Sequence, residues 1–177
     1  MDVSVDLETL GTGPRAVIVS IGAVKFLPTV GGEALSEFYV NVELESCIEA
    51  GLTVDSAVYW WLRQSEAARE ALIHPAPVPL VVALEEFSDF FGSCECLWGN
   101  GSNFDNRLLY SAYHAVGIPY PVHYTRDRDL RTLEWAAKTV SRSTYRRRSR
   151  MPGEVHNALD DAEYQAAIIA DCFDALR

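Results

Sequence analysis

The stretch Val3-Ser4-Val5-Asp6-Leu7-Glu8-Thr9 decides the fold, because its apolar and β-branched residues predict a strand that also carries two carboxylates. Side chains alternate along a strand, so Asp6 and Glu8 project from one face, roughly 6.5 to 7 Å apart. That span suits a pair of divalent ions held about 3.5 to 4 Å apart. The same two acids could also face solvent on an edge strand, so the stretch needs support from the rest of the chain.

The spacing of apolar residues around this strand predicts strands in the first part of the chain and mainly helices in the rest. Runs rich in Val, Ile, Phe and Tyr predict three strands joined by short turns, an antiparallel meander, over 2–7, 15–26 and 35–42. Later segments predict helices over 54–73, 79–91, 103–116, 129–140 and 158–176, a short strand over 95–99 and a loop over 141–155. This order indicates one α/β domain over 1–177, with a central mixed sheet flanked by helices.

The charge of the chain is unevenly distributed. Its net charge is −10, yet residues 126–150 hold nine Lys or Arg against three Asp or Glu. A basic segment beside an acidic body suits a protein that guides phosphates towards an acidic cluster. The alternative is a solvated basic loop without a partner.

The location expected for the chain is the cytoplasm. Its N-terminus is acidic and unlike a signal peptide, and no apolar run is long enough to span a membrane. The four cysteines lack paired metal-ligand spacing, so we expect free thiols in a reducing compartment.

Asp105, in Asn103-Phe104-Asp105-Asn106, is the most informative single acid. In the predicted helix it is in phase with the apolar residues at 108, 109, 112 and 116, so it faces the core. A carboxylate on that face is unfavourable unless it is paired, protonated or bound to a cation. We therefore favour cation binding over helix capping, a role that Asn103 could fill instead.

A second acidic group begins the last predicted helix, in His156-Asn157-Ala158-Leu159-Asp160-Asp161. Asp161 is nearer in phase to the apolar face than Asp160, so we assign Asp161 to the carboxylate cluster. His156 precedes the helix, where a side chain with a pKa of about 6.5 can take a proton from water at neutral pH. A single histidine before a helix can equally be an ordinary polar loop residue.

Together, Asp6-x-Glu8, Asp105 and His156-x4-Asp161 resemble the DEDDh signature of the DnaQ-like 3′–5′ exonucleases. The finer resemblance is to the small bacterial and phage group described as exodeoxyribonuclease VIII-like. It covers nearly the whole chain in order, through residues 6–14, 19–24, 59–62, 98–106, 128–132 and 156–162. The arginine-rich stretch 141–150 departs from that group.

The resemblance implies a ribonuclease H-like fold and hydrolysis of phosphodiester bonds from a 3′ end, releasing nucleoside 5′-monophosphates. Asp6, Glu8 and Asp161 would hold one divalent ion. Asp6 would bridge to a second ion supported by Asp105, and His156 would be the general base. Two Mg²⁺ or Mn²⁺ ions fit the all-oxygen carboxylate set better than Zn²⁺.

Residues that would hold the terminal nucleotide lie next to the first carboxylates and on the helix predicted over 54–73. By the resemblance, Thr9 and Leu10 would contact the terminal sugar or base. Trp60 and Trp61 lie about 100° apart on a helix, so both cannot face the core equally. We assign base stacking to Trp60, with core or dimer contacts as the alternative for both rings.

Further contacts are expected along the substrate strand. Asn103 and Phe104 would line the cleft beside Asp105, and the basic loop would clamp phosphates through Arg146, Arg147, Arg148 and Arg150. The expected partner is single-stranded DNA or RNA with a free 3′ end, with no membrane, and a homodimer is left open. The rival interpretation, a binding module of this fold with reduced catalysis, conflicts with the presence of every motif acid and the histidine.

Overall fold

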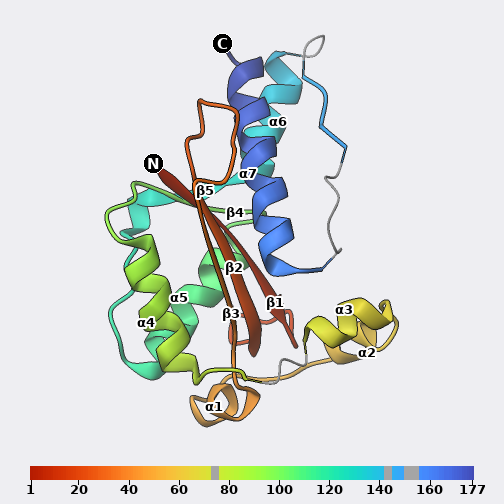
Figure 1. The fold of residues 1–177 in the computed structure, drawn as a ribbon, viewed down its shortest axis with the longest axis vertical. Helices are drawn as coiled ribbons and strands as arrows, with labels where there is room; N and C mark the ends of the chain where they lie inside the picture. The colour runs from red at the N-terminus through yellow and green to blue at the C-terminus, as the bar shows by residue number, and fades with distance from the viewer. Residues whose placement is uncertain (73–75, 142–144, 150–155) are drawn as a thin grey trace.

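The computed structural model describes residues 1–72, 76–141, 145–149 and 156–177. Its five-stranded sheet has the order β3–β2–β1–β4–β5 (Figure 1). The strands are β1 (Asp2–Thr9), β2 (Ile18–Phe26), β3 (Ser36–Asn41), β4 (Leu97–Gly99) and β5 (Asp127–Asp129). The first three pair antiparallel, whereas β4 pairs parallel with β1 and β5 pairs parallel with β4. The predicted meander and mixed sheet are therefore confirmed.

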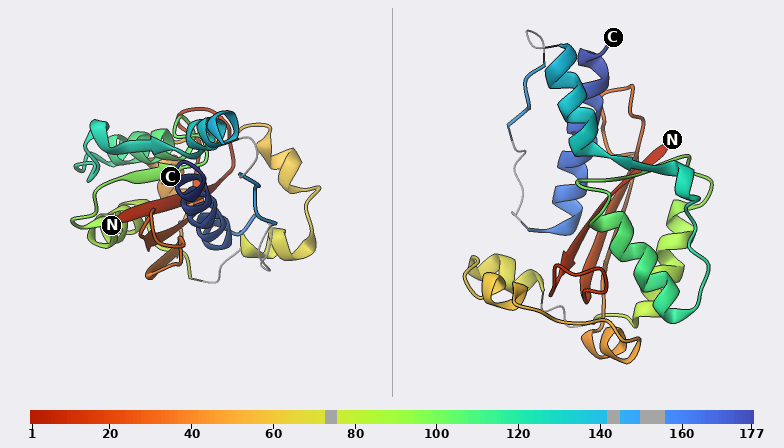
Figure 2. Two further views of the ribbon diagram at one scale, coloured as in Figure 1. Left: turned by 90° about the horizontal axis from the view of Figure 1, so that it is seen from above. Right: turned by 180° about the vertical axis from the view of Figure 1, so that it is seen from behind.

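Helices cover both faces of the sheet (Figure 2). On one face lie α4 (Leu80–Phe91) and α5 (Asp105–Val116), which pack against β3, β1 and β4. On the other lie α6 (Leu130–Val140) and α7 (Ala158–Ala175), and α7 packs against β1 and β2. Each face has its own core of buried apolar residues. No helix among the described residues is long and apolar enough to cross a membrane.

The alternation of β1 directs its acids to the α7 face. Val3, Val5 and Leu7 belong to the core beneath α4 and α5. The residues between them point the other way. Asp6 therefore reaches α7, where its carboxylate accepts a hydrogen bond from Gln165. A central strand buried on both faces thus carries its acids towards a helix rather than towards open solvent.

Gly22 lets α7 begin close to the sheet. It lies opposite Asp6 in the β1–β2 register. A Cβ atom at this position would stand 2.1 Å from the carbonyl carbon of Ala158 and 2.2 Å from the amide nitrogen of Leu159. Only glycine allows the backbone of α7 to approach so closely. The contact fixes where Asp161, one turn into α7, lies relative to β1.

The helix predicted over 54–73 is wrong in one respect, because the chain forms two short helices there. They are α2 (Ala57–Trp61) and α3 (Glu66–Ala71). Ser65 interrupts them, since its hydroxyl accepts the Ala68 amide and caps a new helix. Residue 73 lies outside the described residues. In Figure 1, α2 and α3 project beside the N-terminal end of α7.

The other predicted elements are confirmed to within a few residues, and three short ones were not predicted. These are α1 (Leu44–Glu49), the 3₁₀ turn η1 (Tyr124–Arg126) and β5. The α5 helix ends at Gly117, whose φ of 74° is left-handed, as the sequence predicted. Residues 145–149 of the predicted loop form neither helix nor strand, and most of the remaining loop lies outside the described residues.

Candidate active site

The five side chains predicted to carry the chemistry line one cavity of about 320 Å³. They come from four segments: the strand β1, the first residue of α5, the residue before the N-cap of α7, and the first turn of α7. They are Asp6, Glu8, Asp105, His156 and Asp161. Residues separated by up to 155 positions therefore meet at a single place.

The tightest group in this cavity joins β1 to the start of α7. Ligand atoms of Glu8, His156 and Asp161 all lie within 4.8 Å of one another. Within the described part of the chain, no other three His, Cys, Asp or Glu side chains come together so closely. This places Asp161 in the cluster, whereas the adjacent Asp160 does not line the cavity.

Asp6 lies at the electrostatic centre of the cavity. Burial, followed by the charges of Asp105, Glu8 and Asp161, raises the pKa of Asp6 well above its usual value. One interaction opposes the shift: Gln165 Nε2 donates to Asp6 Oδ1 at 2.7 Å. A site in which burial and three neighbouring carboxylates disfavour the charge of Asp6 is one that a bound cation would stabilise.

Asp105 is buried at the start of α5, with 3% of its surface exposed. Burial raises the pKa of Asp105 to about 7, although its own amide, the Leu7 amide and Arg131 favour its charged form. The N-cap of α5 is Phe104, which makes no side-chain cap bond, so Asn103 does not cap this helix. The predicted core-facing orientation of Asp105 is confirmed.

His156 is held in an uncommon backbone conformation. Its φ of 68° lies in the left-handed region, where histidine is one of the few non-glycine residues enriched. Its amide donates to Asp161 Oδ2 at 3.2 Å. Its ring lies edge-to-face with Trp60, with centroids 4.8 Å apart. The turn and the aromatic contact together direct the imidazole towards the carboxylates.

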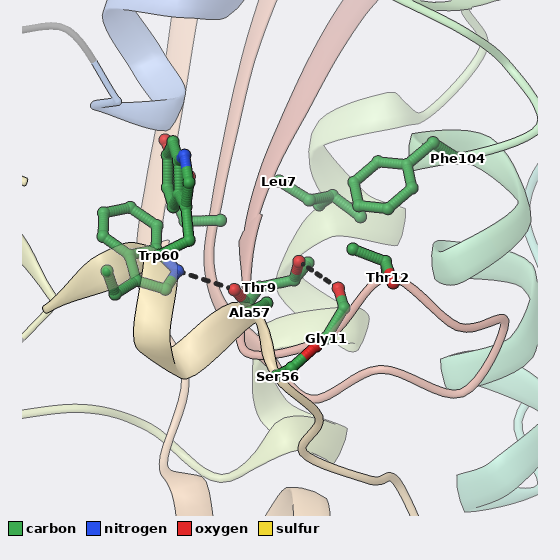
Figure 3. A pocket seen from close by; sticks show the side chains of 10 residues that line it. Leu7, Thr9, Gly11, Thr12, Ser56, Ala57, Trp60 and Phe104 are labelled. Atoms are coloured by element: carbon green, nitrogen blue, oxygen red, sulfur yellow. Dashed lines mark hydrogen bonds between the residues drawn. The ribbon is translucent and has the colours of Figure 1, made fainter. Parts of the chain in front are cut away.

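A second hollow, of about 460 Å³, adjoins the carboxylate cavity and shares Leu7, Glu8 and Phe104 with it (Figure 3). Trp61 is buried, and its indole nitrogen donates to the Thr9 carbonyl at 2.8 Å. This bond anchors α2 to the end of β1. Trp60, at the side of the hollow, is 44% exposed. The two tryptophans therefore do not face the core equally, as their spacing on a helix predicted.

Of the basic loop, Arg147 lines the carboxylate cavity. Its guanidinium is held 2.9 Å from Glu134 on α6. Arg148 pairs with Asp171 on α7, and Arg146 lines a separate hollow beside the same residue. The structure therefore brings one of these arginines to the site and two elsewhere, while Arg150 lies outside the described residues.

Two more predicted contacts do not line the carboxylate cavity. Leu10 packs against the core and lines a hollow with Val17 and Val42. Asn103 is exposed and lines a groove on the outer side of α5. Backbone direction explains both results, because the chain turns after Thr9 and again before Asp105. Spacing along the sequence did not reveal these turns.

Four polar residues of the cavity were not assigned a role from the sequence: Asn100, Arg131, Tyr164 and Gln165. Gln165 follows Asp161 by four positions, so both lie on one helix face, and that spacing could have identified it. Arg131 Nε donates to Asn100 Oδ1 at 3.3 Å, which links the first turn of α6 to the residue that follows β4. Arg131 and Arg147 add positive charge to a cavity dominated by acids.

The residues present fit the divalent cations that such a site implies. The donor set is mainly hard carboxylate oxygen, which suits Mg²⁺ or Mn²⁺. The amide oxygen of Gln165 is also buried in the cavity with no hydrogen-bond partner among the described residues. A water held by a cation could donate to it.

This fold and this site define a DEDDh-type exonuclease. The solved structures that share the fold include two nucleases. The nuclease domain of 3′hExo, a DEDDh family member bound to rAMP, has a TM-score of 0.68 and 15% identity, covering 98% of this chain and 91% of that one. Exonuclease X in complex with 5′ overhanging duplex DNA has a TM-score of 0.58 and 18% identity, covering 98% and 92%.

The chain belongs to the Rv2179c-like 3′–5′ exoribonuclease domain family, whose model matches residues 1–173. It is accordingly an exonuclease, a hydrolase with the ribonuclease H-like fold, and the family implies dependence on divalent metal ions. A separate comparison with curated proteins found no match.

Proposed function

We propose that the protein removes nucleotides one at a time from the 3′ end of single-stranded nucleic acid, RNA in the first instance, and releases nucleoside 5′-monophosphates. The observation that carries this proposal is the convergence of four carboxylates and one histidine on a single cavity. The family description favours RNA over DNA. The test therefore uses both RNA and DNA.

Asp6, Glu8 and Asp161 would hold one Mg²⁺ or Mn²⁺ ion, and Asp6 and Asp105 a second. When bound, such ions supply Lewis-acid stabilisation of the attacking and leaving oxygens. Gln165 would keep the Asp6 carboxylate charged and oriented, because a carboxylate can only accept the hydrogen bond that Nε2 donates. The resemblance to the DEDDh exonucleases supplies these metal assignments, and the position of all four carboxylates in one cavity supports them.

His156 would take the proton of the attacking water. A ring nitrogen of His156 lies within 4.8 Å of carboxylate oxygens of Glu8 and Asp161, next to the place where those acids would hold an ion and its water. Trp60 packs against the same ring and limits its rotation. The backbone amide of His156 also donates to Asp161, which fixes the turn that carries the base next to one of the carboxylates.

The hollow beside the carboxylates would receive the 3′-terminal nucleotide. Phe104 and Trp60 stand on opposite sides of it, and Thr9 lies at its base (Figure 3). Aromatic faces stack on any base, which suits an enzyme that must accept each new terminus. Arg147, steadied by Glu134, and Arg131 would contact the phosphates.

The test is incubation with 5′-labelled RNA and DNA oligomers in Mg²⁺, Mn²⁺ or EDTA. We expect a metal-dependent ladder that shortens from the 3′ end, with RNA cut faster than DNA, and no ladder with Asp6→Ala. Faster cutting of DNA would instead favour the grouping with exodeoxyribonuclease VIII-like enzymes. If the wild type binds metal ions but cuts neither RNA nor DNA, the result would favour the binding-module interpretation.

The neighbouring acids at the start of α7 provide a matched pair. Asp161 lines the cavity and Asp160 does not, although they are adjacent in the chain. We expect Asp161→Asn to reduce kcat at least 100-fold and Asp160→Asn to leave it within about twofold, since electrostatic groups at a reacting centre contribute about 10² to 10³ in rate. Equal losses would contradict the assignment.

A further inference from the structure

A cavity larger than either of the two at the carboxylate site lies outside that site. It is a groove of about 750 Å³ between α5 and residues 120–127, which we call the tyrosine groove. Ligand sites are commonly about 300 to 1,000 Å³, so its volume suffices for one or two nucleotides. Its principal lining residues are Asn103, Arg107, Tyr110, Tyr120, Tyr124 and Asp127.

Aromatic faces are the groove's most unusual property. Tyr110 is 50% exposed and Tyr124 is 79% exposed. Tyr120 is fixed edge-on against Tyr110 and Tyr113, with ring centroids 5.5 and 5.3 Å apart. The groove therefore presents accessible rings on a rigid base, the arrangement on which nucleic acid bases stack.

Arg107 provides positive charge at the same place. Its exposed guanidinium forms no hydrogen bond or ion pair with any residue of the described ranges. The chain has 25 Asp and Glu residues and a net charge of −10. Acidic residues with which Arg107 could pair are therefore plentiful in this protein. The one acid of the lining, Asp127, already accepts a hydrogen bond from the Asn106 amide at 2.9 Å. Arg107 is thus free to contact a phosphate.

The groove and the carboxylate cavity share one turn of the chain. Phe104 and Asp105 line the cavity, while Asn103 and Asn106 line the groove. Consecutive Cα atoms are about 3.8 Å apart, so Asn103 and Asp105 are at most about 7.6 Å apart. The hollow beside Trp60 also adjoins this cavity, because Phe104 lines both. A strand whose 3′ end occupies that hollow can continue across this turn.

We propose that the tyrosine groove binds the nucleotides on the 5′ side of the scissile bond, by stacking their bases on Tyr110 and Tyr124 and pairing a phosphate with Arg107. This rests on the proposed 3′–5′ exonuclease function. It adds a substrate property: the enzyme prefers oligomers long enough to reach the groove over dinucleotides.

The test compares RNA oligomers of two and ten nucleotides with the same 3′ sequence. The variants are Arg107→Ala and the double variant Tyr110→Ala, Tyr124→Ala, with Trp135→Ala as a control, because Trp135 is 67% exposed on α6 and outside the groove. We expect the groove variants to raise KM for the ten-nucleotide substrate at least about fivefold, with unchanged kcat and unchanged dinucleotide kinetics. Thermal melting verifies that each variant is folded.

The outcomes separate the two proposals. If the wild type cuts neither oligomer, the exonuclease proposal fails, and anisotropy of a labelled ten-nucleotide RNA in Ca²⁺ still reports whether the groove variants weaken binding. An equal change for both lengths, or no change for either, overturns the groove proposal. So does a change of oligomeric state in the tyrosine double variant, since the groove would then be a contact between copies.

Discussion

Gln165 and Asp6 illustrate how one neutral side chain tunes the acidic cavity. Gln165 is 3% exposed and donates to Asp6 at 2.7 Å. A hydrogen bond to a charged group contributes about 1.5 to 3 kcal/mol. Without it, the burial and neighbouring charges that already raise the pKa of Asp6 would act unopposed. Gln165 therefore favours the form of Asp6 that binds cations.

Replacing Gln165 with leucine tests this effect, because the substitution keeps a similar volume and removes the donor. We expect Mg²⁺ affinity, measured by calorimetric titration at pH 7, to fall about tenfold or more. The Asp160→Asn variant removes an acid outside the cavity and should retain the affinity of the wild type. Unchanged affinity in Gln165→Leu would show that Asp6 needs no such support.

Asp129 holds the turn between β4 and α5 as well as capping α6. It accepts the Ser102 amide, the Thr132 amide and the Thr132 hydroxyl, each at 2.7 Å. Partial burial acts in the opposite direction, yet these bonds keep the pKa of Asp129 below its usual value. The charged carboxylate is thus more stable in the folded chain than in the unfolded chain.

The stabilisation by Asp129 is expected to depend on pH. A depressed pKa contributes stability above the unfolded value of about 3.9, and this contribution is lost as pH falls through the folded pKa. Asp129→Ala should lower the free energy of unfolding by about 1 kcal/mol at pH 7 in urea titrations. The difference from the wild type should shrink towards pH 3. A constant difference would rule out the charge as its source.

The residues of the site divide into those that the sequence identified and those that it could not. Asp6, Glu8, Asp105 and Asp161 stood out by their positions in the predicted strand and helices, and the resemblance to the DEDDh signature grouped them with His156. Arg131 and Gln165 were missed, since an exposed arginine and a helical glutamine look ordinary until the fold brings them to a cavity. Their catalytic and binding roles, like those of the five, stay predictions.

At the scale of elements, the contact between β2 and α7 determines the cavity's shape. Gly22→Ala would insert a methyl group where the α7 backbone lies 2.1 Å away. We expect the variant to lose about 1 to 3 kcal/mol of stability and most of its Mg²⁺ affinity, because Asp161 moves away from β1. Urea denaturation and calorimetry measure the two effects.

Gly13→Ala serves as the matched control for that substitution. A Cβ atom at Gly13 would meet nothing within 4 Å, and its φ is not in the left-handed region. We expect it to change stability by no more than about 0.5 kcal/mol. Similar losses in both variants would mean that the close approach of α7 is not what constrains Gly22.

Short elements were the least predictable part of the fold. The strand β5 has the sequence Asp-Arg-Asp, which lacks apolar alternation and forms because β4 offers it a partner. The break between α2 and α3 depends on the capping bond of Ser65, which helical periodicity alone does not reveal. The long strands and helices were predictable because each has a strongly apolar face, as α4 does with Leu80, Leu84 and Phe87.

At the scale of the whole molecule, the carboxylate cluster that would bind cations is expected to lower the stability of the metal-free protein. Clustered carboxylates disfavour the folded state in the absence of metal. We expect Asp6→Asn to melt several degrees above the wild type in EDTA, since about 1 kcal/mol shifts Tm by about 2 to 4 °C in a chain of this size. In saturating Mg²⁺ the order should reverse, because ligand at 100 times Kd adds about 2.7 kcal/mol. Melting curves that do not depend on metal would contradict this.

The hydrogen bond between Asp6 and Gln165 joins residues 159 positions apart, and this separation has a consequence during protein synthesis. At about 5 to 20 residues per second, β1 leaves the ribosome roughly 8 to 32 s before α7 can dock on it. Until then the acids of β1 lack Asp161 and the histidine that completes them. A nascent chain, or one ended early by a premature stop codon, therefore lacks the assembled cavity, and we expect it to have no exonuclease activity.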